Sequence, residues 1–233
     1  MKKVSLVICA LLVCASIVRA TAQKNVTTTR QVADFNAVSI SGGIDLYIAQ
    51  GSVQSVRVEA ADDIQKNIIT EVRNGTLEIY YSSDLRFKWN KKMSAHVTVP
   101  SLTGLNASGG SDVYSQGAWK INNLKLVATG GSDVKFEVYG TMLDCVTTGG
   151  SDLTLKGKVS VLKVDASGGS DMDSNELQAD KVNVTASGGS DLTLRVSTEL
   201  VANANGGSDI YYRGNPTRIS KSSSGGSDIV RKD

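Results

Sequence analysis

The sequence of 233 residues has little of what catalytic and metal centres are built from. It contains one histidine, His96, three cysteines, two prolines and only 5% aromatic residues. One histidine leaves one side chain to act as a general base, and no spacing of Cys or His is typical of a zinc site. Cys145 falls in a column of apolar residues and is expected to be inert core. We therefore expect neither an enzyme nor a bound cofactor.

The chain also lacks an apolar run of the roughly 20 residues that a membrane span needs. The run from Val4 to Val18 is shorter, follows two lysines and ends at small residues, a pattern typical of a secretory signal peptide over residues 1–22. Its removal leaves 22 bases against 23 acids, a net charge of −1. We expect export to the periplasm, outer membrane or cell surface. Nucleic acid is not an expected partner, because its binding needs a concentrated basic face.

What the chain has in abundance is a repeat. The tetrapeptide Gly-Gly-Ser-Asp occurs seven times, at steps of 18 to 21 residues. Residues two positions before each motif are small, and residues directly after it are apolar, as are those six positions before the last six motifs. These positions are even numbers of residues apart, so strand alternation places them on one face. The motifs begin at Gly109, Gly130, Gly149, Gly168, Gly188, Gly206 and Gly225.

A coil of about 19 residues cannot bury its own apolar face, but stacked coils bury each other's faces. The repeat therefore predicts an all-β fold, a single-stranded, right-handed parallel β-helix with Gly-Gly-Ser-Asp corners over residues 101–233. An antiparallel barrel or sandwich is the main alternative. Residues 23–100 are predicted to form an irregular N-terminal β part of the same solenoid, with a short helix over Asp62–Val72. The strands expected there are Phe35–Ile40, Ile44–Ile48, Val56–Ala60, Leu77–Tyr81 and Ala95–Val99.

The aspartates of the motif are the best candidates for chemistry. In stacked coils their carboxylates would lie about 5 Å apart, where each pair of unit charges costs roughly 1 kcal/mol at the dielectric of water. Hydrogen bonds from turn amides can stabilise such a column, and this is the favoured reading. Calcium held between successive carboxylates is the alternative, since it takes six to eight oxygen ligands. The column comprises Asp112, Asp133, Asp152, Asp171, Asp191, Asp209 and Asp228.

A few aromatic residues are candidates for ligand binding. Trp89 lies in a basic loop over residues 82–92, and Tyr211 and Tyr212 follow the sixth motif. The alternative is that the loop aromatics cap the core. A β-helical polysaccharide lyase or glycosidase is the rival function, with the acids at Met172–Glu176 or the segment Tyr211–Arg213 as its site. Against it, the corners are alike, whereas a catalytic site normally breaks the pattern.

The sequence resembles a known family in two places. One is the segment Phe35–Val38 followed by Ser41–Ile48, and the other is the set of Ala-Ser-Gly-Gly-Ser-Asp corners. The family is that of the putative auto-transporter adhesin, head GIN domain proteins, exported β-solenoids common in Bacteroidetes. Gly43-Ile44-Asp45 stands where the family name suggests Gly-Ile-Asn. The resemblance implies a secreted or envelope protein with a β-helical body.

Together these features predict a non-catalytic, adhesin-like binding or structural module of the cell envelope or surface. Its outward face, with Ser, Thr, Asp and occasional Tyr, would be presented to a glycan or protein of the envelope or of a host surface. The last coil, which ends at Asp228–Asp233, is almost uncapped. The open end of the solenoid is therefore expected to allow a homodimer.

Overall fold

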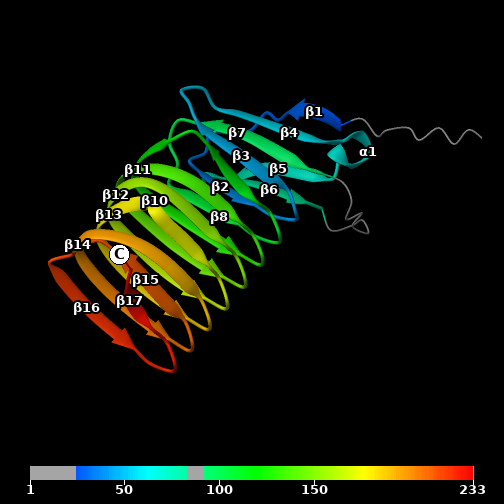
Figure 1. The fold of residues 1–233 in the computed structure, drawn as a ribbon. Helices are drawn as coiled ribbons and strands as arrows, with labels where there is room; N and C mark the ends of the chain where they lie inside the picture. Colours follow the sequence, from blue (N-terminus) through cyan, green and yellow to red (C-terminus); the bar gives the residue numbers. More distant parts are fainter. Residues whose placement is uncertain (1–24, 83–91, 233) are drawn as a thin grey trace, which may run out of the picture.

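The regular part of the chain forms coils that stack in parallel, as the repeat predicts. The computed structural model describes residues 25–82 and 92–232, and it shows a stack running from the blue and cyan N-terminal strands to the red C-terminal ones (Figure 1). The signal peptide predicted for residues 1–22 and the candidate Trp89 lie outside the described residues.

Neighbouring coils pair residue by residue, at the spacing of the motif. Partners such as Val113 and Val134, or Leu192 and Ile210, differ by 18 to 21 residues, and the solenoid has about seven turns. The strands of this part are β8 (Gly104–Ala107), β9 (Val113–Gln116), β10 (Trp119–Thr129), β11 (Val134–Thr148), β12 (Leu153–Ser167), β13 (Met172–Ser187), β14 (Asp191–Asn205), β15 (Asp209–Arg213), β16 (Arg218–Ser223) and β17 (Ile229–Arg231).

Two faces of the solenoid meet at the Gly-Gly-Ser-Asp corner, and the strands of both faces belong to one continuous sheet. We call face A the outer surface of the segments that follow each motif, such as β9, β15 and β17. Face B is the outer surface of the segments that precede each motif, such as β8 and β16. A long strand such as β12 contributes to both faces, because it keeps its parallel partners along its whole length.

The interior is filled by the apolar columns that the sequence alternation predicts. Leu126, Cys145, Val164 and Val184 are register partners, and each is at most 2% exposed. Burial raises the pKa of the Cys145 thiol, so this cysteine is inert core as expected. His96 points outward from its strand, also as expected.

At the N-terminal end, the order of the coils in space differs from their order in the chain. Strands β2 (Ala37–Ile40) and β3 (Asp45–Gln50) pair in parallel with β8 and β9 on one side. On their other side they pair in parallel with β6 (Thr76–Tyr81) and β7 (Ser94–Val99). The coil formed by β6 and β7 therefore lies outside the coil formed by β2 and β3, although it comes later in the chain.

Antiparallel strands close this end. Strand β4 (Ser55–Ala61) lies between β7 and β1 (Asn25–Thr29), and β5 (Ile68–Arg73) pairs with β6. The helix predicted over 62–72 is wrong beyond α1 (Asp62–Gln65), because the β-branched residues from Ile68 onward form a hairpin with β6. Its turn is Asn74-Gly75, both with positive φ. No helix of the described residues is long and apolar enough to cross a membrane.

Candidate functional site

The motif corner is built by two glycines in the left-handed region and a buried serine. Gly149 and Gly150 have φ of 70° and 73°, a conformation that residues with a Cβ rarely adopt. Ser151 is fully buried, and its Oγ accepts hydrogen bonds from the backbone N–H groups of Gly131 and Ser132, both at 3.1 Å. The corner serine therefore links one coil to the preceding one.

The corner serines do not contribute to the outward face, whose serine and threonine side chains come from other positions of the coil. Six of the seven are fully buried and the last is 7% exposed. The sequence indicates that the corner serines point inward, because each stands two residues before an apolar residue, as Ser132 does before Val134. Outward-facing hydroxyls come instead from residues before the glycines, such as Thr148 and Ser167.

The aspartates of the motif form the predicted outward column, and their carboxylates bind backbone amides. Asp112 Oδ1 accepts from the N–H of Asp133 at 3.3 Å, and Asp209 Oδ1 accepts from the N–H of Asp228 at 3.0 Å. Similar bonds join Asp152 to Asp171 and Asp171 to Asp191. This is the structural role that the sequence favours.

The column is longer than the seven motifs, because Asp45 precedes Asp112 in it. Burial, and then the charge of Asp112, raise the pKa of Asp45. Burial and the two flanking aspartates likewise raise the pKa of Asp133. Within the described ranges, no three Asp, Glu, His or Cys side chains group as metal ligands. Calcium binding by the column stays the untested alternative.

The two predicted tyrosines differ in exposure. Tyr211 is half-buried on face A, donates its hydroxyl to Asp209 Oδ2 at 3.0 Å, and has Lys232 Nζ 3.3 Å from its ring centroid. Tyr212 is only 4% exposed. The prediction that Tyr212 contacts a ligand is therefore wrong, because strand alternation turns its ring into the core.

A stack of three aromatic rings on face A was not predicted. Tyr47 lies between His96 and Tyr114, with ring centroids 5.1 and 5.3 Å apart and planes within 19°. Burial and the neighbouring Asp112 raise the pKa of Tyr114 to about 12. The two outer rings cover both faces of Tyr47, so the stack joins three coils. Because the three coils are out of chain order, sequence spacing could not show it.

The acidic side chains of Met172–Glu176, proposed above as the site of the alternative enzyme, form hydrogen bonds and an ion pair with neighbouring residues. Asp173 Oδ1 accepts from the side-chain amide of Asn175 at 2.9 Å and from the hydroxyl of Thr193 at 3.1 Å. Glu176 pairs with Lys156 at 3.1 Å. The strand register shifts here, so the extra residues form a bulge on face A.

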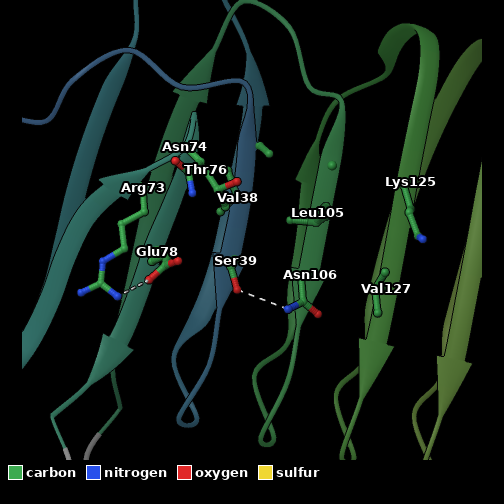
Figure 2. A pocket seen from close by; sticks show the side chains of 12 residues that line it. Val38, Ser39, Arg73, Asn74, Thr76, Glu78, Leu105, Asn106, Lys125 and Val127 are labelled. Carbon is green, nitrogen blue, oxygen red and sulfur yellow. Dashed lines mark hydrogen bonds and ion pairs between the residues drawn. The ribbon is translucent and has the colours of Figure 1, made fainter.

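A shallow, open hollow lies on face B, where β6, β2, β8 and β10 run side by side (Figure 2). It has a volume of about 470 Å³. Its floor is low because Ala37 and Gly104 are adjacent in a column that continues with Lys125. The rim contains Arg73 and Asn74 from the β5–β6 hairpin on one side, and the β10 residues on the other. We call this hollow the face B groove.

A family model described as "Putative auto-transporter adhesin, head GIN domain" matches residues 34–216. No protein with curated annotation is significantly similar to the chain. Solved structures show the same fold at low identity. A putative adhesin from Bacteroides fragilis is 22% identical, with a TM-score of 0.82 over 91% of this chain and 98% of the other.

Two further solved structures, both from Parabacteroides, cover the same shares of the two chains. One is a putative lipid binding protein from Parabacteroides distasonis, 21% identical with a TM-score of 0.72. The other is a putative adhesin from Parabacteroides merdae, 17% identical with a TM-score of 0.71. At these identities the likeness establishes the β-solenoid fold.

Proposed function

Because the chain belongs to the putative auto-transporter adhesin, head GIN domain family, we propose that it is an exported, non-catalytic binding module of the cell envelope or surface. Family membership supports an adhesin-like role. The proposed partner is a glycan or protein at the envelope or on a host surface. The pattern of residues 1–22 supports export.

The observation that carries this proposal is the register of outward polar side chains on face B. One column runs through Thr129, Thr148, Ser167, Ser187 and Asn205, one residue per coil. Coils are about 4.8 Å apart, and hydrogen bonds along each strand fix their positions. A rigid, repetitive polar surface suits a polymer or an extended partner, because many weak contacts add at high effective concentration.

The absence of catalysis is supported by how the acids are used. The motif aspartates accept backbone hydrogen bonds, and Asp173 and Glu176 are paired with neighbours. A saccharide turnover assay separates this proposal from the rival lyase or glycosidase. We expect no product from neutral or acidic polysaccharides, and release of new reducing ends would contradict the non-catalytic assignment.

The binding proposal is tested with the purified protein on a glycan array and in pull-downs from envelope extracts. We expect at least one reproducible ligand. Two empty results would overturn the proposal. Cell fractionation tests export, with the processed chain expected to begin at Gln23 in the envelope or the medium; a cytoplasmic, unprocessed chain would contradict it.

The C-terminal end of the solenoid supports the proposal of a homodimer. Strands β16 and β17 pair on one side only within the described residues. Ile219 and Val230 on these strands are 48% and 43% exposed. Pairing of two such ends would bury both side chains and satisfy the open strand edges. Light scattering should show a dimer that is lost in Ile219→Lys; a strict monomer at high concentration would exclude it.

A further inference from the structure

The face B groove carries polar groups that are free to bind a ligand. Asn106 donates a hydrogen bond from Nδ2 to Ser39 Oγ at 3.3 Å, which leaves its amide oxygen without a protein partner among the described hydrogen bonds (Figure 2). Arg73 Nη2 pairs with Glu71 Oε1 at 2.8 Å, and Arg73 Nη1 lies 3.7 Å from Glu78 Oε2. The Arg73 and Glu78 side chains are 60% and 33% exposed, so each keeps polar atoms open to solvent. The groove thus offers donors and acceptors over a few ångströms.

The floor and the lining of the face B groove argue against two classes of ligand. The floor is the face of a sheet whose backbone amides already pair with neighbouring strands, so a peptide cannot bind there by adding a strand. Among the residues that the structure describes, no aromatic side chain lines the groove, and the apolar residues that line it are small or mostly buried. An acyl chain would therefore bury little apolar surface. A ligand that fits must both donate and accept hydrogen bonds, as sugar hydroxyls do.

The width and direction of the groove favour a linear ligand. Thr76 and Lys125 flank Ala37 and Gly104 in the same column, so the walls are three strand spacings apart, about 14 Å between backbones. A second hollow of about 300 Å³ is lined by Ser101–Thr103 and Lys120–Asn123. These segments lead directly into Gly104 and Lys125, so the two hollows lie along one path.

We propose that the face B groove binds a segment of a linear oligosaccharide through Asn106, Lys125 and the Arg73–Glu78 pair. This inference rests on the proposed binding function and names the ligand class and its place. The groove lies at the junction of the N-terminal coils with the regular body. There the outward column that contains Lys125 continues with only glycine and alanine, so its side chains become small.

Gly104 provides a variant that fills the groove. Its φ lies in the ordinary region, and a Cβ there would lie 3.4 Å from Ala37 Cβ, a contact that small shifts accommodate. Gly104→Gln therefore puts a long side chain over the floor. Ser220 stands in the same column on the last coil, so Ser220→Gln is the matched control.

Asn106 provides a second variant that removes a single polar group. Asn203 is the same residue type in the same face B column, five coils away, and serves as its control. Thermal unfolding of all four variants checks that each is folded, and Asn106→Ala keeps the test valid if Gly104→Gln does not fold.

The probes are tetra- to hexasaccharides of glucose, mannose, galactose and N-acetylglucosamine, immobilised for interferometry against the full exported chain. We expect the wild type, Ser220→Gln and Asn203→Ala to bind one of them alike. Gly104→Gln and Asn106→Ala should bind it at least about tenfold more weakly, the loss expected for a hydrogen bond or more.

Two results would overturn the inference, and they differ in what they leave standing. Wild-type affinity in both groove variants would place the saccharide elsewhere and leave the proposed function intact. No binding of any probe by the wild type would remove the saccharide inference, and a protein captured specifically from envelope extracts would then still support the binding module.

Discussion

The corner serines are predicted to stabilise the solenoid unequally, and Ser151→Ala is the sharpest test. Ser151 Oγ is the hydrogen-bond acceptor for two backbone N–H groups of the preceding coil. Ser170, one coil on, instead donates to the carbonyl of Ser167 in its own coil, at 2.8 Å. Both serines are fully buried, and replacement by alanine leaves almost no cavity at either position.

The expected magnitudes follow from what each substitution leaves unpaired. Ser151→Ala orphans a buried and a partly buried donor, and each such group costs about 1–3 kcal/mol. The sum is about 2–6 kcal/mol, and we expect the lower half, about 2–4 kcal/mol, because water reaches the partly buried donor. Ser170→Ala removes one hydrogen bond whose carbonyl partner lies near the surface, and should cost about 1 kcal/mol. Ser160→Ala, at an exposed position, should stay within about 0.5 kcal/mol of the wild type.

The assay is equilibrium unfolding in guanidinium chloride, followed both by circular dichroism and by tryptophan fluorescence. Coincident transitions with unchanged slope are required before midpoints are compared, because stacked repeats can unfold in parts. Equal destabilisation by Ser151→Ala and Ser170→Ala would refute the reasoning that the coil-to-coil acceptor is the costly part of the corner.

Three further predictions concern the glycines and the aspartates. Gly157→Ala should lower the free energy of unfolding by more than about 3 kcal/mol in the same assay, because its Cβ would overlap the carbonyl oxygen of Val138. Gly150→Ala meets no atom and should lose about 1–2 kcal/mol from its positive φ alone. A larger loss for Gly150→Ala than for Gly157→Ala would contradict this reasoning. The raised pKa of Asp133 means that its ionised form opposes folding, so stability should rise as pH falls through that pKa. Asp133→Asn should therefore raise the Tm at pH 7, with a gain that shrinks toward pH 3; an equal gain at both pH values would argue against this origin. Calcium, added at fixed ionic strength and compared with EDTA and magnesium, should give no selective rise in Tm, because the aspartate carboxylates already accept amide hydrogen bonds. A saturable, calcium-selective rise in Tm would instead show that the aspartate column binds the ion.

The regular body could be predicted from the sequence, because each coil repeats the same pattern of glycine, apolar and outward polar residues. The parity of Ala128, Val134 and Leu143 predicted which side chains are buried, and the glycine pair predicted the corner. The same parity also places the motif serine Ser132 inside. Tyr212 is a similar case, since it stands two residues after the buried Ile210.

The face B groove and the aromatic stack could not be predicted in the same way. Ala37 and Gly104 are 67 residues apart in the sequence, and they become neighbours only because the coil at 76–99 is displaced to the outer side. No motif marks that displacement. The β5–β6 hairpin had a local signal in Asn74-Gly75, which the helix predicted over residues 62–72 did not take into account.

The displaced coil also sets the order in which the chain can assemble. Residues 37–50 leave the ribosome or a translocation pore early, yet both coils that pack against them, 76–99 and 104–116, follow later. A seed with its edges paired therefore needs roughly the first half of the chain. After that, every further coil needs only about 19 residues and one preformed neighbour. During synthesis the closed N-terminal end is therefore complete first, and each later coil can pair with the coil before it as soon as it emerges.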